Sequence, residues 1–229
     1  MVCIFCDKKN NANSIEHIVP ESFGNKLYIL PKGTVCDACN NRFSNFEGKA
    51  LTNSVFAMER ARLGVVTKKG KNSKGKVNDL IIEGDENFRK TYLTIKGIDR
   101  NNTKDFNPIK KTFKIVVPAF DKSEVATSKL LLSIGLESIY KSQIKVFKNY
   151  DFSNLKNYLT NQKNQDWPFT TSHYEIEKFT SVPTFYDKYN LRKAHCKLAY
   201  LELDQNSLIF QFDFVLFYPL LLDQMSFFQ

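Results

Sequence analysis

Three short stretches near the start of the chain decide its fold: Cys3-Ile4-Phe5-Cys6, Glu16-His17-Ile18-Val19-Pro20 and Val35-Cys36-Asp37-Ala38-Cys39-Asn40. A Cys-x2-Cys pair can direct two thiolates at one tetrahedral zinc ion, with Zn–S bonds of about 2.3 Å, and two pairs complete the site. The 29 residues between Cys6 and Cys36 exceed the spacing of a usual zinc ribbon and leave room for a β-hairpin that carries the Glu-His pair. The predicted ligands of one structural zinc ion are Cys3, Cys6, Cys36 and Cys39.

Length and composition bound the class of protein. The 229 residues suffice for one large domain, or for a small and a medium one, with a sizeable core. No charged and apolar signal segment precedes Cys3, and the longest apolar stretch, 215–222, is far shorter than the roughly 20 residues that cross a bilayer. Cysteines that serve as zinc ligands suit a reducing compartment. These features predict a soluble, cytoplasmic protein with no membrane partner.

The net charge of +9 is concentrated in one segment. Residues 61–115 hold 14 Lys and Arg against 6 Asp and Glu, whereas 1–60 hold 7 against 6 and 116–229 hold 12 against 12. Such an excess suits nucleic-acid binding, because each bound cation displaces a condensed counterion from the polyphosphate. The alternative is a solvated surface loop. The lysines that we expect to contact nucleic acid are Lys68, Lys69 and Lys71.

The pattern of apolar residues predicts an α+β fold in three parts. Residues 1–63 form the zinc-stabilised unit, 64–118 a basic, strand-rich segment, and 119–229 an α+β domain whose role the sequence does not indicate. A Lys/Gly/Asn/Ser stretch at 67–78 predicts a mobile loop. The expected helices are 40–62 with Gly64 as its stop, 122–148 and 152–162. The expected strands are 65–66, 79–82, 91–95, 113–117, 174–179, 195–203 and 207–217, with a turn at 204–206.

The residues between the cysteine pairs suit phosphodiester hydrolysis, which needs an activated water and a cation to neutralise charge on the phosphate. A neutral imidazole such as His17 can take the proton of that water near pH 7. Glu16 and Asn40 offer the oxygen ligands that suit Mg²⁺ or Mn²⁺. Neighbours on a regular strand face opposite sides, so we expect a turn, bulge or strand end at Glu16-His17. Arg42, near the helix start, could contact phosphate or be a plain surface residue.

These residues resemble a known family. The pattern Cys-x2-Cys, then Glu-His-Ile-Val-Pro-Glu-Ser-Phe-Gly-Asn at 16–25, then Val-Cys-x2-Cys-Asn at 35–40, is similar to the zinc-bearing branch of the HNH (His-Me finger) endonucleases. The run from Glu16 is also similar to the start of the HNH domain of Cas9. The resemblance covers roughly residues 1–60. It implies a β-hairpin and helix around one catalytic ion, with His17 as general base and with Glu16 and Asn40 as ligands of Mg²⁺ or Mn²⁺.

The resemblance also implies partners and a biological setting. Its substrate would be DNA, with RNA possible, and its role would be in restriction, antiphage defence or homing. This chain departs from the family by having Glu16 where Asp is usual. It also shows no clear counterpart of the middle Asn that braces the loop, because Pro31 lies near the expected place. We therefore expect a loosened His17 and a low activity, or one that needs a partner. Further contacts could come from Asn25, Asn41 and Glu47.

Two other functions fit the same residues. One is a catalytically silent, zinc-stabilised DNA-binding module, and the other is an adaptor whose function resides in 120–229. The C-terminal domain could bind a protein partner, and the oligomeric state is not indicated. His173 and His195 have no partners at ligand spacing, and Cys196 is predicted to be a core residue. Trp167 is a candidate nucleic-acid contact, although a core position is favoured.

Overall fold

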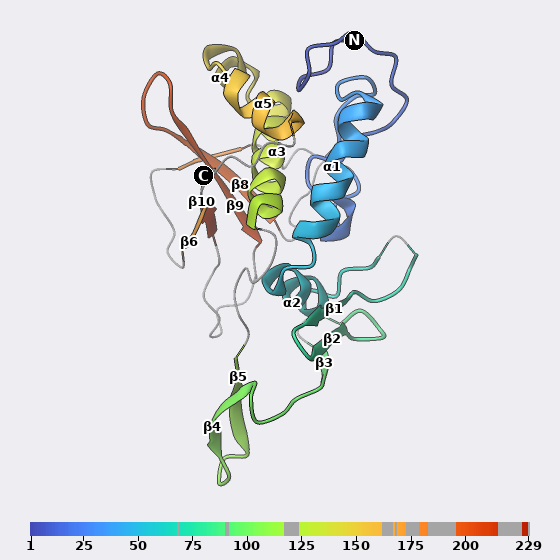
Figure 1. The fold of residues 1–229 in the computed structure, drawn as a ribbon, viewed down its shortest axis with the longest axis vertical. Helices are drawn as coiled ribbons and strands as arrows, with labels where there is room; N and C mark the ends of the chain where they lie inside the picture. The colour runs from blue at the N-terminus through green and yellow to red at the C-terminus, as the bar shows by residue number, and fades with distance from the viewer. Residues whose placement is uncertain are drawn as a thin grey trace. The chain divides into compact units, whose positions relative to one another are not determined.

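The computed structural model describes most of the chain. Its described residues are 1–67, 69–89, 92–116, 124–161, 167, 169–172, 179–182, 196–214 and 226–228. They pack into two compact units. Unit 1 comprises Met1–Gly48 and Val125–Gln229, and unit 2 comprises Lys49–Glu124. Helices and antiparallel sheets occur together, so the predicted α+β class is confirmed (Figure 1).

Most helices belong to unit 1. They are η1 (Glu21–Phe23), α1 (Asp37–Ala50), α3 (Glu124–Ser142), α4 (Ile144–Asn149) and α5 (Ser153–Thr160), while α2 (Ser54–Arg62) lies in unit 2. The helix predicted at 152–162 is confirmed as α5.

Two helices that were predicted to be continuous are each interrupted in the structure. The helix predicted at 40–62 is divided between α1 and α2, because the Thr52 hydroxyl donates to the Lys49 carbonyl and Asn53 takes an extended conformation before α2. Short polar side chains favour such local bonds over a continuous helix. The helix predicted at 122–148 is interrupted at Gln143, whose backbone has φ −135° and ψ 52°. Gly64, the predicted stop, follows α2 with a φ of 65°.

A five-stranded antiparallel sheet forms the other half of unit 1. Its strands lie in the order β6-β10-β9-β8-β7, with bounds Thr170–Ser172, Ser226–Phe228, Leu208–Phe214, Cys196–Glu202 and Thr180–Ser181. The predicted strands near 195–203 and 207–217 and the turn at 204–206 are confirmed as the β8–β9 hairpin, in which Leu198 lies opposite Phe212. Cys196 is buried in β8, as predicted for a core residue. His173, His195 and most of the strand predicted at 174–179 fall outside the described residues.

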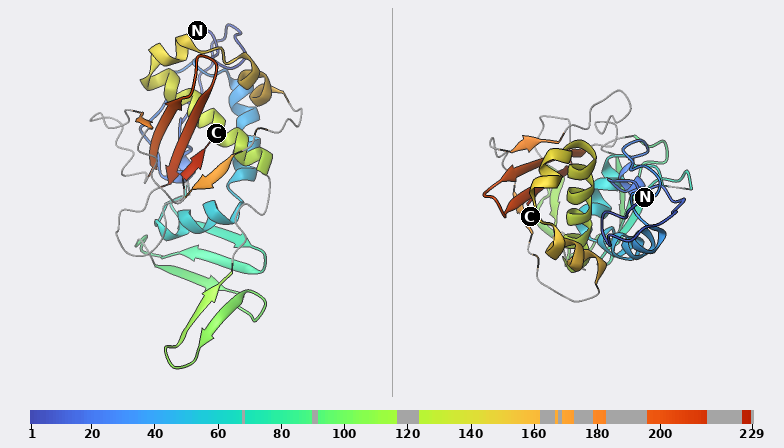
Figure 2. Two further views of the ribbon diagram at one scale, coloured as in Figure 1. Left: turned by 90° about the vertical axis from the view of Figure 1, so that its left-hand side faces the viewer. Right: turned by 90° about the horizontal axis from the view of Figure 1, so that it is seen from above.

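Helix α3 lies between the sheet and α1, so that unit 1 is layered (Figures 1 and 2). The sheet approaches α3 closely at Gly135, where a Cβ would stand only 2.8 Å from the ring of Phe210. The N-terminal segment is fastened to these later elements by an edge contact between Phe23 and Phe212 at 5.8 Å. A 2.7 Å hydrogen bond between the hydroxyls of Tyr28 and Ser142 adds a second link. Residues far apart in sequence therefore share one core.

Unit 2 contains two separate small sheets. The strands β1 (Lys74–Val77), β2 (Leu80–Gly84) and β3 (Leu93–Lys96) form one, and β4 (Thr103–Asn107) and β5 (Thr112–Ile115) form the other. Helix α2 packs on β1–β3 through Ala57 and Ala61 against Val77 and Ile82. Strands predicted at 79–82, 91–95 and 113–117 correspond to β2, β3 and β5. The loop predicted at 67–78 was wrong at residues 74–77, which form strand β1, and a hydrogen bond from the Thr67 amide to the Lys71 carbonyl closes a turn before this strand. The mobility of the segment stays a prediction.

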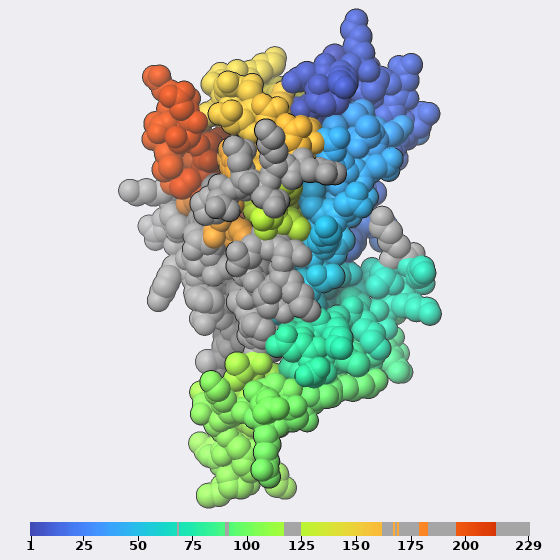
Figure 3. All heavy atoms as spheres, viewed as in Figure 1, coloured from blue at the N-terminus to red at the C-terminus, as the bar shows by residue number. Residues whose placement is uncertain are grey.

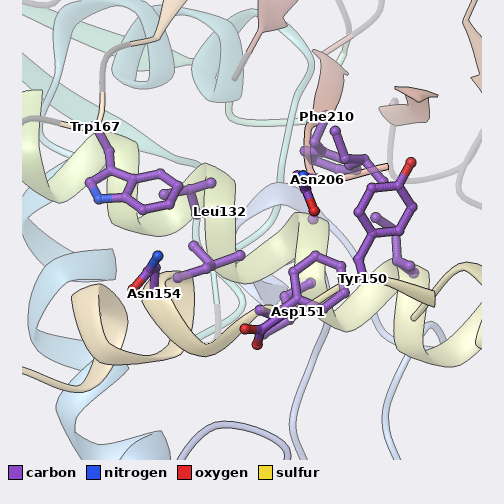
Figure 4. A pocket seen from close by; sticks show the side chains of 13 residues that line it. Leu132, Tyr150, Asp151, Asn154, Trp167, Asn206 and Phe210 are labelled. Atoms are coloured by element: carbon purple, nitrogen blue, oxygen red, sulfur yellow. The ribbon is translucent and has the colours of Figure 1, made fainter. Parts of the chain in front are cut away.

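A cavity of about 190 Å³ lies in unit 1 between α3, the start of α5 and the β8–β9 hairpin (Figure 4). Its walls include Leu132, Tyr150, Trp167 and Phe210. Trp167 stacks on Tyr158 at 5.5 Å and is half-buried, which agrees with the favoured core position. The N-terminal residues predicted to act on nucleic acid do not line this cavity.

No helix in the described part of the chain is long and apolar enough to span a membrane.

Candidate metal centre and active site

Four cysteine thiols converge on one point in unit 1. The Sγ atoms of Cys3, Cys6, Cys36 and Cys39 all lie within 4.8 Å of one another, and those of Cys6 and Cys36 are 3.7 Å apart. Tetrahedral coordination with Zn–S bonds of about 2.3 Å requires sulfur atoms about 3.8 Å apart. The donor set and its spacing therefore fit one zinc ion, and the prediction that these residues are positioned for zinc is confirmed.

Backbone geometry builds this cluster from two parts of the chain. The first pair sits on a tight turn, in which the Cys3 amide donates to the Lys8 carbonyl and the Asp7 amide to the Cys3 carbonyl, each at 3.0 Å. The second pair lies at the start of α1. A 3.0 Å bond from the Ile4 amide to the Thr34 carbonyl joins the two parts. The Cys36 amide also donates to the Cys3 sulfur at 3.4 Å.

The thiols differ in acidity. Hydrogen bonding from the Cys39 side chain, helped by the Cys36 backbone, lowers the pKa of Cys3 to about 4. The same bond raises the pKa of Cys39, and burial raises it further. One thiolate is thus already favoured within the cluster. A zinc ion would favour the thiolate form of all four, because zinc binds the deprotonated sulfur.

Glu16 and His17 lie on a hairpin between the two cysteine pairs. The Leu30 amide donates to the Glu16 carbonyl at 2.9 Å, and His17 forms an isolated antiparallel bridge with Ile29. The pairing ends after the 3.2 Å bond from the Ile18 amide to the carbonyl of Tyr28, and η1 follows. A hairpin is therefore present, but it is a short bridge and not a ladder of strands. The predicted strand end at Glu16-His17 agrees with this geometry.

Asn25 braces the end of this hairpin. It is 2% exposed, and its amide nitrogen donates to the carbonyls of Val19 at 2.6 Å and Tyr28 at 2.9 Å. Its Oδ1 accepts from the amides of Leu27 at 3.2 Å and Tyr28 at 2.9 Å. The expectation that the loop lacks a bracing Asn was wrong. The brace lies earlier than Pro31, directly after Gly24, whose φ of 90° turns the chain back.

Carboxyl groups from three parts of unit 1 interact electrostatically with one another. Glu16 is 9% exposed, Glu47 is half-buried on α1, and Glu137 on α3 is 2% exposed. Burial raises the pKa of Glu137 well above its usual value, and the negative charges of Glu16 and Glu47 raise it further. Glu137 could not be predicted from the sequence, because an apolar helix pattern does not show which distant carboxyl a residue will face. A divalent cation at this place would offset the mutual repulsion.

The remaining predicted site residues occupy two regions. Asn40 lies in the first turn of α1, where its amide donates to the Cys36 carbonyl at 3.0 Å, and its side chain is half-buried. Asn40 and Glu47 are seven residues apart, so they lie on the same face of α1. Arg42 is exposed, and its charge contributes to lowering the pKa of the largely buried Lys129, for which burial is the main cause.

The predicted lysines lie in unit 2. Lys69 and Lys71 are exposed on a turn in which the Thr67 amide donates to the Lys71 carbonyl at 2.8 Å. Lys68 is outside the part of the chain that the structure describes. Nucleic-acid contact by these lysines stays a prediction.

Comparison with known proteins identifies one related family. Residues 3–56 match the family model HNH_5, described as HNH endonuclease. The match begins at the first zinc-site cysteine and ends within α2, so it covers both cysteine pairs, the Glu16-His17 hairpin and α1. The predicted resemblance to HNH endonucleases is confirmed for this segment, whereas similarity to Cas9 stays a prediction. Searches of curated proteins and of solved structures found no match.

Proposed function

We propose that the chain is a metal-dependent endonuclease that hydrolyses phosphodiester bonds of DNA, with residues 3–56 as its catalytic module. The match of this segment to HNH endonucleases supports nuclease activity in general. The observation that carries the proposal is the convergence of the four thiols, because they hold both ends of the Glu16-His17 hairpin against the start of α1. The resemblance to the family further implies a biological role in restriction, antiphage defence or homing.

The residues fit two kinds of metal ion. Four thiolates suit zinc, which would fix the module and take no part in the reaction. The oxygen donors of Glu16 and Asn40 suit Mg²⁺ or Mn²⁺. Such a cation would favour the ionised form of Glu137, whose pKa is raised by burial and by the charges of Glu16 and Glu47. When bound, this second ion would supply positive charge to neutralise the phosphate in the transition state.

The protein groups have separate tasks in the reaction. His17 takes a proton from a water molecule through a ring nitrogen as the water oxygen attacks phosphorus. A new P–O bond forms while the bond from phosphorus to one sugar oxygen breaks, and that oxygen leaves with a proton from solvent. Asn25 holds the loop that follows His17, so it is a positioning residue. Nothing in this scheme requires a covalent intermediate with the protein.

Metal dependence tests the proposal directly. Supercoiled plasmid is incubated with the purified chain in Mg²⁺, in Mn²⁺ and after brief chelation, and zinc is quantified in each sample. We expect nicked or linear DNA in either divalent ion and none after chelation, with zinc retained. A folded, zinc-containing protein that binds DNA and cleaves it under none of these conditions would instead be the silent binding module.

The proposed ligands can be tested apart from cleavage. Glu16→Gln and Asn40→Ala should each weaken binding of Mn²⁺ to the DNA-free protein while the zinc content stays at one ion per chain. Asn41→Ala is a matched control, because Asn41 is the exposed neighbour of Asn40 on α1. Mn²⁺ affinity that is unchanged in both ligand variants would contradict the assignment.

A further inference from the structure

The β4–β5 hairpin of unit 2 lacks the packing that usually stabilises a sheet. It forms a sheet of its own, and no residue from Thr103 to Ile115 is buried. In Figures 1 and 2 it extends away from the β1–β3 sheet of the same unit, and Figure 3 shows its side chains at the surface. A two-stranded hairpin alone is marginally stable in water. The hairpin is therefore a candidate to be covered by a partner.

Local hydrogen bonds close the base of the hairpin. The Asn102 side chain accepts from the Asp99 amide and donates to the Gly97 carbonyl, each at 3.0 Å. The Val116 amide donates to the Asn102 carbonyl at 2.9 Å and closes the two strands at this end. The hairpin is thus an arm with an ordered base.

The tip of the arm carries apolar side chains in contact with solvent. Ile109 follows Pro108 in the loop between the strands and is 92% exposed. Phe106 on β4 is 73% exposed, and Phe113 on β5 is 43% exposed. Single exposed apolar residues are ordinary, but three within eight residues concentrate exposed apolar surface on one arm.

The same arm is strongly cationic. Residues 103–115 contain four Lys and one Asp. Lys104 lies directly opposite Lys114 in the antiparallel register, an arrangement that destabilises a hairpin unless an anion neutralises it. Asp105 pairs with Lys114 at 2.6 Å, while no described residue forms an ion pair with Lys104. Lys110 and Lys111 follow the apolar tip and are also exposed.

We propose that the β4–β5 hairpin is a DNA-binding arm that enters a groove of duplex DNA. A two-stranded ribbon has the width that a groove admits, and its lysines would contact the phosphates on either side. Pro108 and Ile109 would act as an apolar wedge at a base step, a contact that kinks the duplex. The proposal rests on DNA as the substrate, and it adds a binding element outside the residues that match the HNH model.

Binding without cleavage tests this arm. The full chain is titrated into a fluorescent DNA duplex at several salt concentrations without added Mg²⁺ or Mn²⁺, and duplex bending is followed by energy transfer between its ends. The charge variant is Lys104→Gln, Lys110→Gln and Lys111→Gln together. We expect its affinity to fall at least tenfold and its salt slope to decrease by about 2–3, since each phosphate that a lysine neutralises adds about 0.9 to the slope.

A wedge variant and a control complete the test. Ile109→Ser should weaken binding and reduce bending while leaving the salt slope unchanged, because it removes no charge. The matched control replaces three lysines of unit 1 outside residues 3–56 by Gln, namely the half-buried Lys141 and the exposed Lys145 and Lys148, and should retain most of the affinity.

Several outcomes would overturn the proposal. One is a charge variant whose affinity falls no further than that of the control. Another is an Ile109→Ser protein that binds and bends DNA like wild type. A third is sedimentation that shows Ile109→Ser dissociating a dimer without changing DNA affinity, which would identify the arm as an interface between copies. Because no divalent ion is added, a chain that binds DNA through the arm but never cleaves would contradict the proposed function alone.

Discussion

Replacement of Asn25 tests whether the loop after His17 depends on one side chain. Asn25→Ala removes four hydrogen bonds, with donor–acceptor distances from 2.6 to 3.2 Å. It leaves the Val19 carbonyl and the Tyr28 amide without this partner in a buried place, and the Tyr28 carbonyl keeps only its bond from the Ile18 amide. A net contribution of about 1 kcal/mol for each of the three buried bonds predicts a decrease of about 3 kcal/mol in the free energy of unfolding.

The single tryptophan provides the assay. Trp167 lies half-buried in unit 1 and stacks on Tyr158, so its fluorescence reports the unfolding of the unit that contains Asn25. Urea titrations of the zinc-loaded proteins give the change in midpoint and, with the slope, the change in free energy. Asn41→Ala is the control, since this exposed helix position should change stability by less than about 0.5 kcal/mol.

A second variant sharpens the result. Asn25→Asp keeps an acceptor for the Tyr28 amide but turns a carboxylate oxygen toward the two carbonyls that now accept from the Asn25 nitrogen. Asn25→Asp should therefore lower the free energy of unfolding at least as much as Asn25→Ala does. A decrease below about 1 kcal/mol for Asn25→Ala, or an Asp variant as stable as wild type, would refute the bracing role.

Three further changes probe the zinc site, the basic segment and the carboxyl cluster. Cys36→Ser should abolish zinc binding and the structure of the N-terminal module, measured as metal content and circular dichroism; unchanged zinc content would contradict the ligand assignment. Neutralising Lys68, Lys69 and Lys71 together should weaken DNA binding and lower its salt slope by about 0.9 for each phosphate that these lysines neutralise in the wild-type complex. A salt slope equal to that of wild type would exclude these three lysines as phosphate contacts. Glu137→Gln should weaken Mn²⁺ binding about tenfold or more while zinc stays bound. A Mn²⁺ affinity equal to that of wild type would show that Glu137 takes no part in binding this ion.

The sequence predicted those parts of the fold that depend on local spacing. The two Cys-x2-Cys pairs predicted the zinc cluster, because tetrahedral coordination leaves few other arrangements for four thiolates. The apolar alternation of 195–203 and 207–217 predicted the β8–β9 hairpin. Helix boundaries were less accurate, since a single hydroxyl bond at Thr52 and the conformation of Gln143 interrupt patterns that look continuous.

The candidate site could be predicted only in part, because tertiary packing completes it. Glu16 and His17 stand in a recognisable motif, whereas Glu137, which interacts electrostatically with Glu16, lies on a helix more than a hundred residues later. Asn25 was considered only as a minor contact, because its four bonds depend on the turn at Gly24. Charge counting located the basic segment but not the arm, which is defined by strand pairing and by the exposure of Ile109.

The central claim is that His17 activates water at the zinc-held hairpin. The most direct test compares nicking of supercoiled plasmid by wild type and His17→Ala in Mg²⁺, with zinc content and DNA affinity measured on the same preparations. The account predicts that the variant keeps its zinc and its DNA affinity but cleaves at least a hundredfold more slowly, as expected when a general base is removed. A zinc-loaded His17→Ala protein that nicks DNA as fast as wild type would contradict the account.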